Sequence, residues 1–522
     1  MTMAANKRTL CPLCGYGCEL EVVFDDLGVR GVEYPKGSPN SGRLCPRGSA
    51  SAIYLDHPRR LTQPLKNDRP VTWDRISKDL QKMVAEPEKL AVVFDRNITH
   101  EEYSRLVAFC HANSIDQYAS AYLESESALS SLIHEQASFS PEQIDKAQVI
   151  CLVGDVFNQS PMISKEIIAW RLRDRKNRLV VIDSMKTHTA AFATDFLKAK
   201  AGTEPLVLLL LALVDLEDQG IEETTGVAAA TINGISQLIK NAGSGGLMFA
   251  SVPFGRSYDD SLWTEGLRLL RDHSGMKLVP LYEFAGYPGG VDFAMIMDRI
   301  REKRIKNLLC LGELFPHHYP QLAKELKGVH LVAATPWRVG SCTAMPLALN
   351  IEKAGTVTTI FGEKTISGAV LAPSGVRTIL ELLPLPGNTS PAEKKSAAAP
   401  RLAANLKARV GQAVERSRQR KKKSYRLVGE KLAFCFGAFF EPEMLKINPE
   451  DAAALRVKDG ETVVVESAQS RQSLPAKISH DTDPGVIAVP AETSLTRGLF
   501  DYWIDEQTVR FMPTAVKIWR KE

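Results

Sequence analysis

Apolar residues recur along the middle of the chain in short runs that alternate with longer amphipathic stretches. Between about residues 60 and 385 the runs are bounded by polar or turn-forming residues, and the stretches between them have helical spacing of apolar positions. The runs predict buried strands at Leu90–Phe94, Val149–Val153, Leu179–Ile182, Gly246–Ala250, Leu308–Leu311 and Val329–Ala333. Strands that alternate with helices predict parallel sheets with helices on both faces.

The two ends of the chain follow a different pattern. The N-terminal segment has one alternating stretch, Glu19–Phe24, and then turns rich in Gly, Pro and Ser, which predicts a small domain of short strands. The C-terminal segment has short apolar runs separated by Asp-Gly and Asp-Pro-Gly turns. These runs predict a small β-barrel with strands at Thr462–Glu466, Leu474–Ile478 and Val486–Val489.

We therefore predict an α/β protein with a small N-terminal domain, two doubly wound α/β lobes and a C-terminal β-barrel. A chain of 522 residues is too long for one hydrophobic core, which agrees with several structural units. The predicted boundaries are residues 1–58 for the N-terminal domain, 59–120 with 328–385 for a discontinuous lobe, 121–327 for the second lobe, 386–424 for a basic linker and 425–522 for the barrel.

The segment 386–424 interrupts the α/β pattern. It is rich in Ala and Lys and ends in the basic run Arg416-Ser-Arg-Gln-Arg-Lys-Lys-Lys423. One interpretation is a solvated, partly helical linker, and the other is a basic patch that docks on an acidic partner surface. No aromatic residues are interleaved with these charges, so the segment does not favour a nucleic-acid partner.

Composition and charge narrow the class of protein. Hydrophobic residues make up 44% and charged residues 24%, as in ordinary globular proteins, and a net charge of +4 gives no argument for nucleic-acid or membrane binding. The start of the chain shows no apolar secretory segment or twin-arginine leader. The longest apolar run, Leu206–Val214, is far shorter than the roughly 18–20 residues of a membrane span. We interpret it as a buried helix and expect a cytoplasmic protein without direct membrane insertion.

Nine cysteines in a cytoplasmic chain do not indicate disulfides. Three thiolates on one tight loop can hold three corners of a cubane, and a fourth from a distant turn can close it. Zinc is the alternative, although zinc ribbons use two C-x2-C pairs and this chain has one. Cys151 and Cys310 lie in apolar runs and are predicted to be buried structural residues. The spacing C-x2-C-x3-C-x26-C predicts a [4Fe–4S] cluster bound by Cys11, Cys14, Cys18 and Cys45.

The segment Cys11-Pro-Leu-Cys-Gly-Tyr-Gly-Cys18, followed by Gly42-Arg-Leu-Cys-Pro-Arg-Gly48, resembles the opening domain of the molybdopterin oxidoreductases. Among these it is most similar to cytoplasmic formate dehydrogenase catalytic subunits and to the large subunit of respiratory complex I. In that family a basic residue two positions after the fourth cysteine lies between the cluster and the pterin. The resemblance assigns this relay position to Arg47, where the family usually has Lys, so the charge is kept in a different geometry.

The resemblance extends over nearly the whole chain. It implies that the lobes and the barrel are those of a molybdopterin-oxidoreductase scaffold, with molybdopterin guanine dinucleotide and Mo or W as a second cofactor. The matching segments are Val153-Gly-Asp-Val-Phe-Asn-Gln-Ser-Pro161, Leu179-Val-Val-Ile-Asp-Ser-Met-Lys-Thr-His-Thr-Ala190, Ala201-Gly-Thr-Glu-Pro205, Ile351-Glu-Lys-Ala-Gly-Thr356, Val457–Val463 and Pro484–Val486.

Polar and glycine residues at predicted strand ends give candidates for binding the dinucleotide, because ligands of open α/β sheets lie beyond the carboxyl ends of strands. Gly154 and Asn158 follow one strand and could let backbone amides approach a pyrophosphate. Asp183 ends the next strand and could receive donors of guanine or ribose. Gly312 and Glu313 end a similar strand in the second half. Ordinary turns contain the same residue types, so the prediction depends on their order along the chain.

Two segments depart from the family pattern. Formate dehydrogenases carry a metal-binding Cys or selenocysteine followed by His where this chain has Ile115–Ser127, which contains no cysteine. Glu124 in that segment is a candidate oxygen ligand for the metal or simply a solvated or helix-capping carboxylate. The family sequence N-x-E-G-R is replaced by Thr359-Ile-Phe-Gly-Glu363, so an Arg suited to binding anions becomes an acid.

Three functions are compatible with these observations. We favour a [4Fe–4S] electron-transfer subunit with a modified or empty molybdenum site, working with flavin or Fe–S partner subunits because one cluster cannot form a long electron path. The alternative is an active Mo or W oxidoreductase of the formate dehydrogenase type, in which the cofactor supplies the chemistry. The third is a scaffold that the cluster only stabilises.

Overall fold

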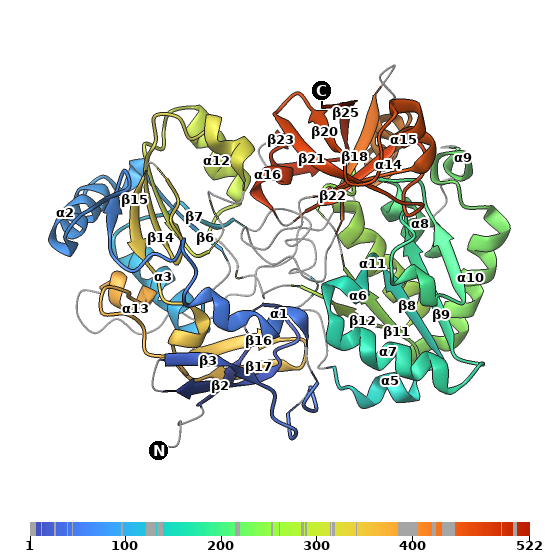
Figure 1. Ribbon diagram of the computed structural model, residues 1–522, viewed down its shortest axis with the longest axis horizontal. Coiled ribbons are helices and arrows are strands. Elements are labelled where there is room, and N and C mark those ends of the chain that lie inside the picture. The colour runs from blue at the N-terminus through green and yellow to red at the C-terminus, as the bar shows by residue number, and fades with distance from the viewer. Residues whose placement is uncertain are drawn as a thin grey trace. The chain divides into compact units, whose positions relative to one another are not determined.

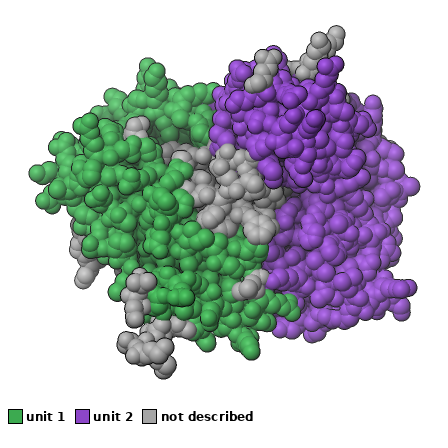
Figure 2. Space-filling model, viewed as in Figure 1, with its two compact units in different colours: residues 1–122, 283–397, 504–509 green, residues 123–282, 398–503, 510–522 purple. Residues whose placement is uncertain are grey.

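The computed structural model has two compact units (Figure 2). Buried apolar strands build one large sheet in each of them. Unit 1 contains residues 1–122, 283–397 and 504–509, and unit 2 contains residues 123–282, 398–503 and 510–522. The structure describes residues 7–11, 13–25, 28–38, 40–43, 45–95, 98–121, 132, 139–213, 220–251, 254–259, 261–282, 287, 290–313, 315, 319–340, 342–384, 406–419, 424–430, 444–491, 493–504 and 509–521.

The N-terminal domain of unit 1 is a small antiparallel sheet with the order β1-β2-β3 (Figure 1). The alternating stretch predicted at residues 19–24 forms β2, and its residues Leu20 and Val22 are buried. After the sheet, the chain forms the short helix α1 and a 3-10 turn at Ser51–Tyr54. The bounds are β1 Lys7–Leu10, β2 Glu19–Asp25, β3 Gly28–Glu33 and α1 Pro46–Ser49.

The larger sheet of unit 1 has the order β5-β4-β15-β14-β13-β6-β7. Its strands from β15 to β7 are parallel, and the antiparallel β4–β5 edge is an element that the sequence pattern does not predict. The bounds are β4 Leu65–Lys66, β5 Arg69–Pro70, β6 Leu90–Phe94, β7 Tyr118–Ser120, β13 Asn307–Leu311, β14 His330–Thr335 and β15 Thr343–Pro346.

The helices of unit 1 begin at clear sequence signals. Thr99 caps α3 and forms a capping box with Glu102, so each residue satisfies a backbone N–H of the other at the first turn. Unit 1 also contains the hairpin β16–β17, which lies near α1 and β3 in Figure 1. The bounds are α2 Trp73–Val84, α3 His100–Ala112, α12 Phe293–Arg301, α13 Ile379–Leu382, β16 Gly355–Thr359 and β17 Gly362–Ile366.

Strand β13 joins a different sheet from the one that the sequence pattern assigns to it. The predicted second lobe extends to residue 327, whereas β13 pairs with β6 and β14 in the sheet of unit 1. The predicted boundary therefore differs from the structure. A fully buried parallel strand is apolar on both faces, so its sequence does not show which of two parallel sheets it joins.

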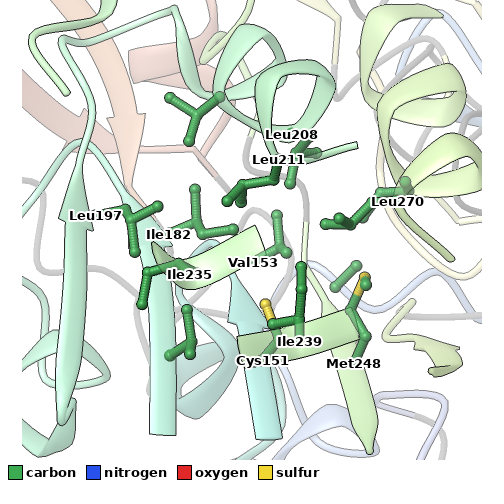
Figure 3. Close-up of a cluster of buried hydrophobic side chains, with 14 of the residues drawn as sticks. Cys151, Val153, Ile182, Leu197, Leu208, Leu211, Ile235, Ile239, Met248 and Leu270 are labelled. Atoms are coloured by element: carbon green, nitrogen blue, oxygen red, sulfur yellow. The ribbon is translucent and has the colours of Figure 1, made fainter. Parts of the chain in front are cut away.

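Unit 2 contains a parallel sheet with the order β10-β9-β8-β11-β12. Helices pack on it through buried apolar side chains, and Figure 3 shows Cys151 and Val153 of β8 within one such cluster. Cys151 is 0% exposed and Cys310 of unit 1 is 1% exposed, which confirms that both are buried. The strand bounds are β8 Val149–Val153, β9 Arg178–Asp183, β10 Asp195–Lys198, β11 Leu247–Ala250 and β12 Lys277–Pro280.

The predicted buried helix at Leu206–Val214 is found as α8, which spans Glu204–Leu211 in the described part of the chain. None of the described helices is both long and apolar enough to cross a bilayer. The bounds of the other helices of this lobe are α5 Glu142–Lys146, α6 Val156–Gln159, α7 Pro161–Arg173, α9 Ile221–Thr225, α10 Ala229–Ala242 and α11 Ser261–Ser274.

The C-terminal part of unit 2 forms a closed barrel with the order β18-β22-β19-β21-β20-β25, which confirms the predicted β-barrel. Outside the barrel strands lie α15 (Pro449–Leu455), α16 (Ser494–Arg497) and the paired strands β23 (Asp501–Ile504) and β24 (Val509–Met512). The barrel bounds are β18 Tyr425–Glu430, β19 Leu445–Ile447, β20 Thr462–Glu466, β21 Arg471–Ile478, β22 Val486–Pro490 and β25 Thr514–Arg520.

The described part of the predicted linker is a docked helix, α14 (Leu406–Arg418). Val410 and Val414 are buried against residues of α8 and α11, and Arg409 forms two hydrogen bonds with the carboxylate of Asp259, at 2.7 and 2.6 Å. The interpretation as a solvated linker is therefore wrong for this helix. The basic residues 420–423 lie outside the described residues, so the docking interpretation stays a prediction.

Candidate functional site

Three of the four predicted cluster ligands lie on the loop that joins β1 and β2. The strands pair up to Leu10 and Glu19, and the amide of Cys11 then donates to the carbonyl oxygen of Cys18 at 2.7 Å. This bond closes the loop at its base, so Cys11, Cys14 and Cys18 share one hairpin turn. The tight C-x2-C-x3-C spacing is thus the length of a single hairpin loop.

The fourth cysteine begins the short helix α1. Cys45 is its N-cap, and Pro46 occupies the first helical position, where its missing N–H leaves no hydrogen bond unmade. A Cβ atom on Gly48 would lie 2.4 Å from the Tyr34 hydroxyl and 3.5 Å from the Cys11 sulfur. The absence of a side chain at Gly48 therefore lets α1 pack closely on Tyr34, within van der Waals reach of the Cys11 sulfur.

The electrostatics of this region suit a metal cluster. Burial is the main cause that raises the pKa of the Cys11 and Cys18 thiols well above the ordinary value, and neighbouring cysteines raise it further. Arg47, 1% exposed, acts in the opposite direction on the pKa of Cys11. Such thiols become thiolates when iron binds them, because the metal supplies the positive charge. The donor set therefore fits the predicted [4Fe–4S] cluster.

No three His, Cys, Asp or Glu side chains among the described residues converge closely enough to hold a single metal ion. A cubane distributes its four ligands over four iron atoms, which is a wider arrangement than a single-ion site. Glu124, the weak candidate ligand for molybdenum, lies outside the described residues.

The segment that departs from the family pattern, Thr359–Glu363, packs on the cysteine loop. The amide of Ile360 donates to the carbonyl oxygen of Gly15 at 2.8 Å, and the rings of Tyr16 and Phe361 meet edge to face at 4.9 Å. A Cβ atom on Gly17 would lie 2.5 Å from the Thr359 methyl group. Three successive residues of the hairpin thus cover three successive residues of the loop.

The acid that replaces the family's arginine, Glu363, faces the side chain of a histidine. A carboxylate oxygen of Glu363 lies 3.5 Å from Nδ1 of His100, and Nε2 of His100 lies 2.9 Å from the Thr358 hydroxyl. Glu101 accepts hydrogen bonds from the amide and the hydroxyl of Thr356, both at 2.8 Å. The hairpin β16–β17 is therefore anchored to the N-terminal end of α3.

The family motif E-x-x-G-T has a structural role in unit 1. Its acid, Glu352, accepts a hydrogen bond from Nη2 of Arg60 at 2.5 Å, and both side chains are buried. Nη1 of Arg60 donates to the carbonyl oxygens of Pro336 and Leu347 at 3.2 and 3.0 Å. The pair thus holds the chain in place just before the hairpin.

Gly312 and Glu313 lie in a closed turn after β13. Gly312 has φ 142°, and Asp95, at the end of neighbouring β6, accepts hydrogen bonds from the amides of Glu313 and Phe315, both at 2.6 Å. The Glu313 carboxylate accepts a hydrogen bond from the Trp337 indole at 3.3 Å. Sequence reasoning did not single out Asp95, although an acid directly after a buried apolar run was its signal.

Gly154 and Asn158 are brought together at the end of β8 by Asp155. Gly154 has φ 76°, a conformation that favours glycine, and Asn158 donates to the Asp155 carboxylate at 2.7 Å. The Thr189 hydroxyl donates to the other oxygen of Asp155 at 2.6 Å. Burial, and then the nearby Asp183, raises the pKa of Asp155 to about 7. Sequence reasoning missed Asp155, which organises this turn.

Asp183 ends β9 as predicted, but its carboxylate is already paired inside the protein. Nη2 of Arg256 donates to Asp183, and Nε of Arg256 donates to Glu204 at 3.2 Å. Asp183 is 0% and Arg256 1% exposed. The amide of Met185 also donates to Asp183 at 3.1 Å. The predicted acceptor for a nucleotide therefore has an internal donor, and the residues around it do not fit a guanine base.

Known proteins resemble both ends of the chain. The description "Molybdopterin oxidoreductase Fe4S4 domain" matches residues 5–57, and "Molydopterin dinucleotide binding domain" matches residues 437–502. These two matches confirm the resemblance to the molybdopterin oxidoreductases for the N-terminal domain and for the barrel region. The two matched domains support the predicted cofactor pair of this family, a [4Fe–4S] cluster and molybdopterin guanine dinucleotide.

Three similar curated proteins are named as subunits of redox enzymes. The chain is 25% identical over 381 residues to the F420-dependent formate dehydrogenase subunit alpha of Methanocaldococcus jannaschii, covering 69% of this chain and 48% of that protein. It is 24% identical over 243 residues to the NADPH-Fe(3+) oxidoreductase subunit alpha of Geobacter sulfurreducens, covering 44% and 28%. It is 24% identical over 252 residues to one subunit of an NADH-quinone oxidoreductase of Rhizobium meliloti, covering 44% and 29%. The chain thus spans less than half the length of these relatives.

A solved structure has the same fold over nearly the whole chain. Acetylene hydratase from Pelobacter acetylenicus superposes with a TM-score of 0.71 at 14% identity, covering 99% of this chain and 100% of that one. This similarity confirms the predicted molybdopterin-oxidoreductase architecture, from the small N-terminal domain to the C-terminal barrel.

Proposed function

We propose that this chain is the [4Fe–4S] electron-transfer subunit of a multi-subunit oxidoreductase, with a modified or empty molybdenum site. The observation that carries the proposal is the contrast between the two cofactor regions. The cysteine loop and the N-cap of α1 together keep four cysteine thiols, whereas Asp183 is paired with Arg256. The segment Ile115–Ser127 also contains no cysteine that could bind the metal.

In this proposal Cys11, Cys14, Cys18 and Cys45 hold the cluster. When bound, a [4Fe–4S] cluster accepts and releases one electron, at a potential that depends on burial and on hydrogen bonds to its sulfurs. Arg47 places a buried positive charge beside it, which favours the reduced and more negative state. The hairpin β16–β17 packs on the loop through Ile360 and Phe361.

The partner subunits would carry a flavin or further Fe–S clusters. The relatives' names support redox partners in general, since they describe one subunit of a formate dehydrogenase, of an NADPH–Fe(3+) oxidoreductase and of an NADH–quinone oxidoreductase. No partner is expected to be nucleic acid, and the proposed place of work is the cytoplasm.

The second candidate is an active Mo or W oxidoreductase of the formate dehydrogenase type. The 25% identity to a formate dehydrogenase subunit alpha favours it. In that case Glu124 or a non-protein ligand would complete the metal, since the corresponding segment has no cysteine.

Metal analysis of the anaerobically purified protein distinguishes the two. We expect about four Fe per chain, no Mo or W, and a low-temperature paramagnetic signal on reduction. One Mo or W per chain together with two pterins would overturn the proposal and establish the second candidate.

A further inference from the structure

The sequence predicts that Asp183 receives donors of guanine or ribose, and in the structure Arg256 donates to it. Guanine presents adjacent N–H donors at N1 and N2, and a guanidinium presents a similar planar pair, so both suit a carboxylate. Within unit 2, Arg256 directs one donor of its planar group, Nη2, to Asp183 and another, Nε, to Glu204. We infer that Arg256 is an internal substitute for guanine and that this part of the dinucleotide site is filled by the protein itself. The inference deepens the proposed function and rests on it.

All three nitrogens of the Arg256 guanidinium have partners. Nη2 donates to Asp183 and, at 2.9 Å, to the Ser184 hydroxyl, while Nε donates to Glu204 at 3.2 Å. Nη1 donates to the carbonyl oxygen of Gly429 at 3.3 Å. A charge that is 1% exposed needs such complete pairing, because burying it unpaired costs several kcal/mol. The arrangement is therefore that of a finished structural site.

The backbone that carries Arg256 is also closely packed. A Cβ atom on Gly429 of β18 would lie 2.1 Å from the carbonyl oxygen of Phe254, so the loop and the barrel strand touch through their backbones. A Cβ atom on Gly202 would lie 2.8 Å from the ring of Tyr258. Since protein interiors hold few voids, a base could not share this space without displacing the loop.

The charges of the network oppose an anionic nucleotide. Arg256 faces two carboxylates, Asp183 and Glu204, and Asp155 lies close enough for Asp183 to raise its pKa. Three acids around one cation leave no positive charge in this network to attract a phosphate group. The same network that stabilises Arg256 therefore disfavours the cofactor that it replaces.

Chemical rescue tests this inference on the full-length protein. Arg256→Ala leaves a cavity with two carboxylates, so we expect a lower melting temperature that rises by several degrees in millimolar methylguanidinium. Urea, which has a similar planar shape without the charge, should not rescue it. The matched control is Arg173→Ala, because Arg173 pairs with Asp145 at 2.8 Å on the surface, where both are more than half exposed. Its melting temperature should not respond to methylguanidinium.

GDP is the second probe. The wild-type protein should show no change in melting temperature with GDP. A rise that Asp183→Asn removes would overturn the inference, as would an Arg256→Ala variant that loses no stability or gains nothing from methylguanidinium.

If Arg256→Ala does not fold, a double-mutant cycle replaces it. Arg256→Lys and Asp183→Asn should each lower the stability, and their combination should cost clearly less than the sum. Strict additivity would overturn the inference. These outcomes are separate from the metal analysis: rescue in a protein that contains Mo would contradict the proposed function alone, and failed rescue in a protein without Mo would contradict this inference alone.

Discussion

In the cysteine loop of unit 1 and at the end of β9 in unit 2, a strand ends in residues suited to bind a cofactor. The two regions differ in whether the protein itself supplies a positive charge to pair with those residues. The thiols of Cys11 and Cys18 have raised pKa values from burial, so they need an added positive charge to become thiolates. The carboxylate of Asp183 already has a cation beside it. In our proposal the first region is completed by a metal cluster, and the second by its own arginine.

The comparison also shows that a segment can match a family motif although its side chains are not available to bind a cofactor. Thr359–Glu363 has lost the family's residues and still packs on the cysteine loop. The segment around Asp183 keeps the family's strand end but uses the acid internally. Motif matches alone would favour the segment around Asp183 over Thr359–Glu363 as part of a cofactor site, whereas their contacts favour the reverse.

The largest effect is expected from removing one of the proposed cluster ligands. Cys45→Ala should abolish the paramagnetic signal of the reduced cluster, because only three thiolates remain for four iron atoms. Cys342→Ala is the control, since Cys342 is also a buried cysteine of unit 1 but lies far along the chain from the loop. Low-temperature electron paramagnetic resonance of both proteins is the measurement. A full signal from Cys45→Ala would show that Cys45 is not a ligand.

The contact between the hairpin and the loop can be tested by filling the space at Gly17. Gly17→Ala places a Cβ atom 2.5 Å from the Thr359 methyl group and strains a residue with φ 68°, so we expect a loss of about 1–3 kcal/mol in the free energy of unfolding. Urea unfolding measures this loss.

Thr359→Ser removes the methyl group and keeps the hydroxyl that bonds the Gly362 carbonyl oxygen at 2.9 Å. The double variant Gly17→Ala/Thr359→Ser should therefore recover part of the free energy of unfolding that Gly17→Ala loses. Gly31→Ala is the control, because nothing lies within 4 Å of its added Cβ atom. Equal losses in Gly17→Ala with and without Thr359→Ser would contradict the contact.

Asp155 in unit 2 should give the stability a pH dependence of its own. The pKa of Asp155 is about 7 in the folded protein and about 3.9 in an unfolded chain, so the folded state binds the proton more tightly. The stability from this group is present at low pH and is lost as the pH rises from about 4 to about 7. Asp155→Asn should remove this dependence, as seen by urea unfolding at pH 5 and pH 8. Parallel pH profiles for the variant and the wild type would exclude Asp155 as its source.

The smallest effect is expected at Glu363. This side chain is 57% exposed and lies 3.5 Å from His100, so Glu363→Gln should cost less than about 1 kcal/mol and the difference should shrink in high salt. The cluster signal should not change. A large loss of signal would mean that the anchor of the hairpin controls the cluster more directly than its contacts indicate.

The sequence predicted those parts of the fold and site that depend on local pattern. Strands β6, β8 and β20 have the predicted bounds because their runs of apolar residues are bounded by clear turn signals. The cysteine loop was predictable for the same reason, since its spacing lies within one hairpin. The role of Arg256 was not, because it depends on partners 52, 73 and 173 residues away along the chain. The docking of α14 likewise depends on Asp259 and on apolar residues of other helices.

The hydrogen bond from Arg256 to Gly429 has a consequence for folding. Two of the three segments that supply the partners of this arginine, residues 183–185 and Glu204, come from the α/β lobe, but the third is the first barrel strand, β18. Before β18 packs against the lobe, the charged side chain of Arg256 and its acidic partners are incompletely buried. The lobe and the barrel of unit 2 should consequently unfold together in one cooperative transition. They should do so although the chain between them passes through unit 1.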